Sequence, residues 1–176
     1  QRSKCKMVNF GIIYGISTFG LAERMQVPRA EAKELIDGYF ATYAKVKEYM
    51  DKSIDLARDN MYTETLFGRR CYLPDINSRN SVVRGYAERN AINAPIQGTA
   101  ADIIKVAMIN IDRRMQREGL RSKMILQVHD ELNFSVYPEE KEVMEYLVVE
   151  EMQNAFKMQV PLVADCGWGK NWLEAH

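Results

Sequence analysis

Four side chains near the start of the chain, spaced four residues apart, could bind a nucleotide. They are Arg2, Lys6, Phe10 and Tyr14. A step of four turns an α-helix by about 400°, so the set drifts only about 40° per step and stays on one face. Two cations near a helix start, where the dipole also attracts anions, suit phosphates, and an aromatic ring can stack on a base. A basic helix start followed by core aromatic residues would show the same spacing.

A second candidate site is the tripeptide His129-Asp130-Glu131, which lies between two apolar runs. If the runs are paired strands, the hairpin apex lifts a carboxylate clear of the sheet, as a metal ligand requires. Asp and Glu are also favoured in turns for local reasons alone. A zinc site at His129 lacks further ligands, because His176 is the only other histidine.

A third pattern consists of Arg89, Asn93 and Gln97, which are again spaced by four and predict one helix face. Their hydrogen-bond donors match the acceptors that every base pair presents in the minor groove. A polar helix face exposed to water is the alternative. Phosphate contact or ordinary surface charge would each explain four further arginines, namely Arg69, Arg70, Arg79 and Arg84.

The elements expected to position these residues give an α+β fold, with a helical first part followed by helices and an antiparallel sheet. Apolar periodicity predicts helices over 3–14, 17–25 (capped by Ser17), 28–43, 44–60, 81–118 and 138–157. Pro95 is expected to kink or divide the long helix. Extended runs predict a hairpin over 62–66 and 70–73, strands over 124–128 and 132–136, and a last strand over 160–166.

Composition excludes several classes of protein. Hydrophobic residues make up 47% and charged residues 27% of the 176 residues, which excludes wholesale disorder. No apolar run approaches the length of about 18 residues that a membrane span needs. The three cysteines are far apart, which excludes a disulfide framework and indicates a reducing cytoplasm. The chain lacks an initiator Met, so we expect a fragment of a longer protein.

The net charge of zero is unevenly distributed along the chain. Residues 1–60 carry +2, residues 61–120 carry +3 and residues 121–176 carry −5. The first two parts could meet a polyanion, whereas the last would repel one unless cations intervened.

Four sequence blocks together resemble the DNA polymerases of family A, of the bacterial DNA polymerase I type. Residues 2–15 match the motif R-x3-K-x3-F-x2-Y-G, and 88–98, 127–132 and 172–176 resemble later motifs in the same order. The resemblance implies a DNA-directed DNA polymerase that acts in replication and repair. It also implies that residues 1–80 belong to the fingers, and residues 81–176 to the C-terminal part of the palm.

The resemblance implies roles for the nucleotide-binding helix. Arg2 and Lys6 would hold the triphosphate of the incoming deoxynucleotide, and Lys6 would also neutralise the leaving pyrophosphate. Phe10 would stack near the sugar and base, and Tyr14 would lie on the template side.

The remaining motifs imply contacts with metal and primer–template DNA. Asp130 resembles the aspartate that binds both catalytic Mg²⁺ ions, with Glu131 as a weaker participant. His129 would line the primer terminus. Arg89, Asn93 and Gln97 would face the DNA minor groove.

One departure affects activity. Nothing in the chain resembles the family's first carboxylate motif, D-Y-S-x-I-E-L-R, which supplies the second metal-binding aspartate. We therefore expect the isolated chain to be inactive, and leave its oligomeric state open. The alternatives are a non-catalytic nucleic-acid-binding module, a metal-dependent hydrolase using His129 and Asp130, and a phage or organellar rather than bacterial polymerase.

Overall fold

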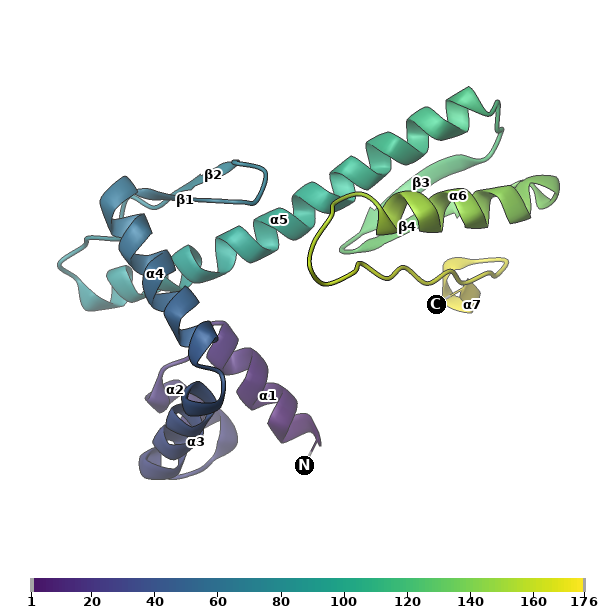
Figure 1. Ribbon diagram of the computed structural model, residues 1–176. Helices are drawn as coiled ribbons and strands as arrows, with labels where there is room; N and C mark the ends of the chain where they lie inside the picture. The colour runs from purple at the N-terminus through teal and green to yellow at the C-terminus, as the bar shows by residue number, and fades with distance from the viewer. Residues whose placement is uncertain (1, 176) are drawn as a thin grey trace. The chain divides into compact units, whose positions relative to one another are not determined.

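The computed structural model describes residues 2–175, without the side chains of residues 3 and 4. His176, the last residue of the C-terminal motif, lies outside this part. Helices and two small antiparallel sheets make up the described chain, which confirms the α+β class (Figure 1). Two compact units are present, one over Gln1–Gly98 and the other over Thr99–His176. Their boundary lies inside a helix, and the assignment of 1–80 to fingers and 81–176 to palm stays a prediction.

The first unit begins with three helices, α1 (Arg2–Ile13), α2 (Thr18–Met25) and α3 (Arg29–Thr42). As predicted, Ser17 caps α2, because its Oγ accepts a hydrogen bond from the Gly20 amide at 3.1 Å. Leu21, Ala22 and Ala32 form the buried centre of this group, and Val8 of α1 and Ile16 after it pack against them.

The rest of the first unit places a hairpin beside two helices. Helix α4 (Ala44–Asn60) is followed by β1 (Tyr62–Glu64) and β2 (Arg70–Tyr72), which pair antiparallel, and then by the start of α5 (Ser81–Arg117). Both strands are shorter than predicted. The buried core of this part of the first unit consists of Ala57, Leu73, Ile76, Ala87 and Ala91.

Close backbone packing joins the hairpin to α5 at Gly98. A Cβ atom on Gly98 would lie 2.6 Å from Cγ2 of the buried Thr65. The Arg69 guanidinium donates to the Gly98 carbonyl at 3.0 Å. Thr65 cannot easily rotate away, because its Oγ1 accepts from the amides of Phe67 and Arg69, each at 3.2 Å. Gly98 is therefore required by the approach of the hairpin.

Helix α5 runs without interruption through Pro95, so of the two predicted effects of this proline, division of the helix is wrong and a kink stays a prediction. Proline cannot donate a hydrogen bond to the carbonyl four residues earlier. In the same turn the Tyr49 hydroxyl of α4 donates to the Ile92 carbonyl at 3.1 Å. Helix α4 thus contacts α5 in the turn that contains Pro95, although at the Ile92 carbonyl and not at the Ala91 carbonyl that the proline leaves without a donor.

The second unit packs the end of α5 and helix α6 (Lys141–Gln153) with a two-stranded sheet. Strands β3 (Lys123–Val128) and β4 (Glu131–Ser135) pair antiparallel, with an irregularity between Met124 and Leu126. A short 3₁₀ turn, η1 (Pro138–Glu140), precedes α6, and α7 (Trp172–Ala175) lies near the end. The buried core residues come from the two long helices and are Ala107, Ile111, Met115, Met144 and Leu147.

Glu140 joins η1 to the start of β3 through a buried carboxylate. Its oxygens accept hydrogen bonds from the amides of Arg121 and Ser122, at 2.9 and 2.8 Å, and from the Ser122 hydroxyl at 2.6 Å. These hydrogen bonds lower the pKa of Glu140, chiefly the one from the Ser122 hydroxyl.

Two predictions for the last part of the chain are wrong. Residues 160–166 do not form a strand, and the preceding helix ends at Gln153 instead of near residue 157. The apolar run has strand composition, but a strand requires a hydrogen-bonded neighbour, and the only partners that the described chain offers β3 and β4 are each other. Val160 and Val163 accordingly remain 73% and 76% exposed. Among the described helices, none is long and apolar enough to cross a membrane.

Candidate nucleotide and nucleic-acid site

Helix α1 and the turn directly after it place Lys6, Phe10 and Tyr14 on one face, as their spacing predicted. The rings of Phe10 and Tyr14 are stacked, with centroids 6.2 Å apart and planes inclined by 15°. The Lys6 amine lies 5.7 Å from the Phe10 centroid. Phe10 is 48% and Tyr14 45% exposed, so neither is a core residue and the alternative of buried aromatics is wrong. Arg2 is also exposed, in the first turn.

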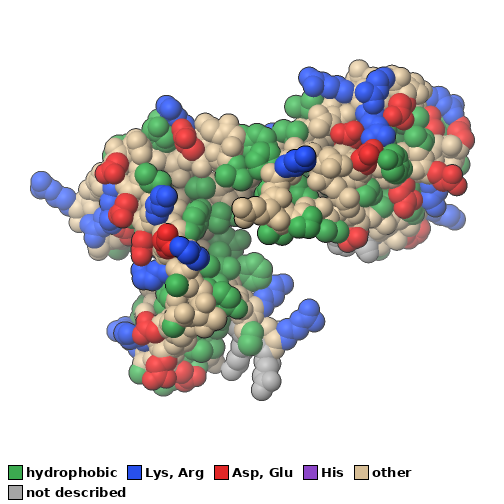
Figure 2. Space-filling model, viewed as in Figure 1, with side chains coloured by type: hydrophobic (Ala, Val, Ile, Leu, Met, Phe, Trp, Pro, Cys, Tyr) green, Lys and Arg blue, Asp and Glu red, His purple; other side chains and the backbone are tan. Residues whose placement is uncertain are grey.

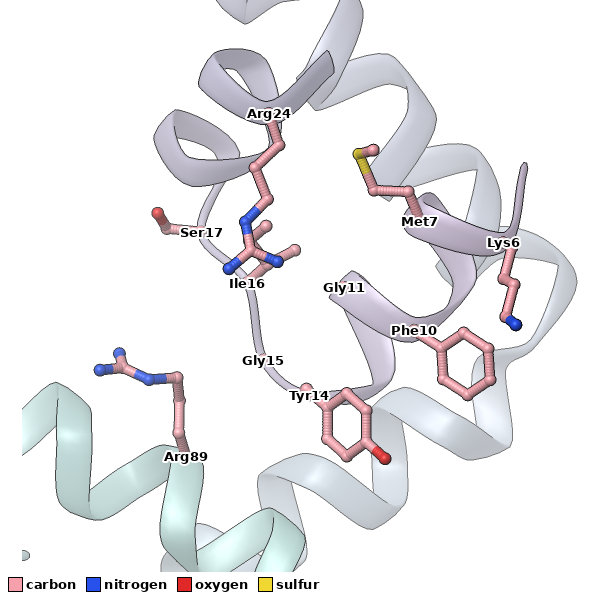
Figure 3. A pocket seen from close by; sticks show the side chains of 10 residues that line it. All are labelled: Lys6, Met7, Phe10, Gly11, Tyr14, Gly15, Ile16, Ser17, Arg24 and Arg89. Atoms are coloured by element: carbon pink, nitrogen blue, oxygen red, sulfur yellow. The ribbon is translucent and has the colours of Figure 1, made fainter. Parts of the chain in front are cut away.

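This face borders a surface hollow of about 590 Å³ in the first unit (Figure 3). Its lining comes from α1, the segment after it, α2 and α5, and consists of Lys6, Met7, Phe10, Gly11, Tyr14, Gly15, Ile16, Ser17, Arg24 and Arg89. Three of these described residues are cations and none is acidic. An apolar, aromatic wall with three positive charges suits an anionic ligand that carries rings.

At Gly15 the wall of the hollow meets helix α5. Its φ of 72° is left-handed, which ends α1, and a Cβ atom there would lie 3.2 Å from Cγ of Arg89. The aliphatic part of Arg89 therefore lies directly against the Gly15 backbone. The structure thus places Arg89, which belongs to the third sequence pattern, beside the end of α1.

The α5 pattern is only partly exposed. Arg89 and Gln97 are exposed, whereas Asn93 is half-buried and its Oδ1 is buried without a hydrogen-bond partner in the described chain. Gln97 lines a second, smaller hollow of about 270 Å³ together with residues of the hairpin, including Glu64 and Arg69. That the Asn93 side chain faces the same way as those of Arg89 and Gln97 stays a prediction.

The β3–β4 turn displays the predicted carboxylate. His129 has a left-handed φ of 54°, and its carbonyl accepts a hydrogen bond from the side-chain Nε2 of Gln127 at 2.6 Å. Such a conformation is uncommon for a residue other than glycine. Asp130 is exposed, and the half-buried Glu131 opens β4 opposite Val128. Among the described residues, no three His, Cys, Asp or Glu side chains are grouped closely enough to hold a metal ion by themselves.

Residues 1–174 match the sequence profile described as DNA polymerase family A. The chain belongs to DNA polymerase family A.

Relatives in this family are similar over nearly the whole chain. The DNA polymerase I of Caldicellulosiruptor bescii is 51% identical over 99% of this chain and 20% of that protein. DNA polymerase I of Streptococcus pneumoniae is also 51% identical over 99% of this chain and 20% of its own length. The chain therefore spans about a fifth of the length of these relatives.

A solved structure has the same fold. The POL domain of Pol1 from M. smegmatis, in complex with DNA primer-template and dNTP, matches with a TM-score of 0.95 and 47% identity. The match covers 99% of this chain and 31% of the other.

In this family A polymerase chain, the further arginines differ in their partners. Arg70 pairs with Glu64 at 2.9 Å and Arg84 lies 3.7 Å from Glu88, whereas Arg69 binds the Gly98 carbonyl. On the face in Figure 2, acidic and basic side chains are interspersed rather than separated. Their role as phosphate contacts stays a prediction.

Sequence reasoning missed Arg24, although it lines the hollow. Its only signal in the sequence is a positive charge at the end of a short helix, which is common for helix-dipole reasons. Its position depends on how α2 folds back beside α1, and the sequence pattern of α2 alone does not contain that information.

Proposed function

We propose that this chain is the nucleotide-binding and carboxylate-bearing part of a DNA-directed DNA polymerase, which adds deoxynucleotides to a primer in DNA replication and repair. The observation that carries the proposal is the exposed Lys6–Phe10–Tyr14 face bordering a hollow that also contains Arg89. The M. smegmatis domain of the same fold was solved with DNA primer-template and dNTP. These are the substrates that we infer for the protein carrying this chain.

Nucleotide binding follows from the chemistry of the α1 face. Arg2 and Lys6 offer charge-assisted hydrogen bonds to the triphosphate, and the Lys6 ammonium neutralises charge on the departing pyrophosphate. Phe10 stacks near the sugar and base. The exposed ring of Tyr14 packs on the template side of the new base pair, and stacking tolerates all four bases because each has a π-face.

Primer–template binding is assigned to α5 and to the β3–β4 turn. Arg89 and Gln97 are exposed donors for the acceptors common to all base pairs in the minor groove, and we assign the Asn93 amide the same role. His129 is placed beside the primer terminus. Such degenerate contacts suit an enzyme that must accept every sequence.

Metal binding is assigned to Asp130, with Glu131 as the weaker participant. Their oxygen atoms are the donor type that Mg²⁺ prefers, and magnesium commonly takes only one or two protein carboxylates with the rest from water and phosphate. The exposed turn fits such a partial ligand set, because no complete one is grouped among the described residues. When bound, two Mg²⁺ ions would activate the primer hydroxyl and stabilise the leaving oxygen.

Two alternatives make different demands on the same residues. A metal-dependent hydrolase centred on His129 and Asp130 would need further ligands, which the described residues near the turn do not provide. A non-catalytic nucleic-acid-binding module would retain DNA binding without incorporation.

The test is single-turnover incorporation by the full-length protein, alongside a DNA-binding titration, for wild type and Lys6→Ala. We expect Lys6→Ala to slow incorporation by roughly 10²-fold or more, the effect of losing one charge-stabilising donor. Binding of primer–template should change little. The matched control is Lys52→Ala, which removes an exposed lysine of α4 that does not line the hollow. DNA binding by wild type without any incorporation would favour the non-catalytic module.

A further inference from the structure

Two arginines from different helices border the hollow in the first unit, Arg24 on α2 and Arg89 on α5. Figure 3 shows the Arg24 side chain extending toward Ile16 and the Arg89 side chain rising from α5 beside Gly15, while Lys6 lies nearer the start of α1. The segment between α1 and α2 thus has an arginine of α2 and an arginine of α5 beside it. Both arginines therefore present forked hydrogen-bond donors to the same hollow.

Neither guanidinium is neutralised by a carboxylate in the described part of the chain, in contrast to several other arginines. Arg58, Arg70 and Arg114 all form ion pairs with Glu or Asp. Arg89 has only the ring of Tyr86, 5.9 Å away. Two like charges that border the same hollow repel each other, so a bound anion would be stabilised by both.

Local packing positions both residues. The aliphatic part of Arg89 lies against the Gly15 backbone. Arg24 belongs to the last turn of α2, whose position is fixed by the buried Leu21 and Ala22 and by the cap at Ser17. The Ser17 Oγ accepts a hydrogen bond from the Gly20 amide, so its own proton is available to an anion.

We propose that Arg24, together with Arg89, binds a backbone phosphate of the template strand next to the segment 15–17. The proposal rests on the proposed polymerase function and adds Arg24 as a DNA-binding residue. A phosphate of the incoming nucleotide has the same chemistry. The template is favoured because Arg89 is continuous with the α5 face assigned to DNA, whereas Lys6 serves the triphosphate from α1.

The test measures primer–template affinity and single-turnover incorporation for Arg24→Ala and Arg24→Lys in the full-length protein. The DNA is either a primer–template with a single-stranded template overhang or a blunt duplex. Loss of one phosphate contact should lower the slope of log affinity against log salt by about 0.7–0.9. The affinity of wild type should therefore fall roughly threefold more than that of Arg24→Ala between 50 and 200 mM salt.

We expect the salt effect with the overhanging template, its recovery in Arg24→Lys, and an unchanged half-saturating nucleotide concentration. Lys52→Ala is the control for general loss of positive charge. A raised half-saturating nucleotide concentration with unchanged DNA affinity would assign Arg24 to the triphosphate and overturn the template assignment. Equal DNA binding by Arg24→Ala and Lys52→Ala would overturn the proposal entirely. If wild type incorporates nucleotides normally, both of these results contradict only the role of Arg24 and not the proposed polymerase function.

Discussion

At the β3–β4 turn, Asp130 is exposed beside a histidine in a left-handed conformation. Asp130→Asn retains the size of the side chain but removes its negative charge. In the full-length protein we expect incorporation to fall by roughly 10³ to 10⁵, equivalent to ~4–7 kcal/mol of transition-state stabilisation. DNA binding should persist, because its contacts are assigned to Arg89, Asn93 and Gln97. Single-turnover incorporation and a DNA-binding titration measure the two effects.

The neighbouring carboxylate provides the matched comparison. Glu131 is half-buried as the first residue of β4, so its carboxylate is less available than that of Asp130. Glu131→Gln should therefore slow incorporation far less. Near-normal incorporation by Asp130→Asn would remove Asp130 from the catalytic centre and contradict the metal assignment.

Phe10 is expected to influence the choice of sugar. The resemblance to family A implies that in Phe10→Tyr the added phenol oxygen can replace the 3′-hydroxyl that a dideoxynucleotide lacks. The ratio of incorporation of dideoxy- to deoxynucleotides should therefore rise, with little change in stability because Phe10 is 48% exposed. Competition between the two nucleotides measures this ratio, and an unchanged ratio would show that the α1 face is misassigned.

At the scale of elements, the hairpin depends on a glycine in α5. Gly98→Ala would bring a methyl group to 2.6 Å from Thr65 Cγ2, so the hairpin must move. We expect destabilisation by ~1–3 kcal/mol, the usual cost of overpacking. Gly85→Ala is the control in the same helix, because its Cβ would approach only the flexible Arg89 guanidinium, at 3.6 Å. That change should stabilise by ~0.5–1 kcal/mol through helix propensity. Chemical denaturation of both variants tests the difference.

The link between η1 and β3 predicts an acid-sensitive contribution to stability. Hydrogen bonds lower the pKa of Glu140 in the folded state, so its stabilising effect is complete above the unfolded pKa of about 4.3. The effect is lost as the pH falls through the lowered folded value. Glu140→Gln should lower Tm at neutral pH, and the difference from wild type should shrink toward pH 3. Glu142→Gln, an exposed neighbour, should leave the pH profile of Tm unchanged.

Local sequence signals predicted most elements, whereas tertiary packing decided the rest. Periodicity and the Ser17 cap located α1 to α4 because those signals lie within each helix. Pro95 does not divide α5, and the hydrogen bond from the Tyr49 hydroxyl to the Ile92 carbonyl in the same turn joins residues 43 positions apart, which no local signal reveals. The apolar run at 160–166 was misjudged because strand composition does not supply a partner strand.

The candidate site shows the same division. Regular spacing was sufficient to predict that Lys6, Phe10 and Tyr14 share an exposed face. Arg24 enters the hollow only through the packing of α2 beside α1, and Asn93 is partly buried by its surroundings. Neither property is visible in the residues of one helix.

At the scale of the whole molecule, the 176-residue chain offers only part of a metal site among its described residues. We expect the isolated chain not to extend a primer. We also expect it to self-associate, because β3 displays Ile125 and Leu126 at 63% and 52% exposure on a two-stranded sheet. Primer extension above background would contradict the first expectation. A monomer at high concentration in light scattering would contradict the second.

The continuity of α5 through Pro95 has a consequence for local unfolding. Proline has no exchangeable amide hydrogen, so the helix lacks one hydrogen bond three residues before the boundary between the two units, at Gly98/Thr99. When the helix unfolds from its Arg117 end, a junction between unfolded and folded helix at Pro95 costs one hydrogen bond less than a junction elsewhere, because that bond is already missing. The two halves of this single helix can therefore exchange their amide hydrogens as separate cooperative segments, each with the stability of the core that it packs against.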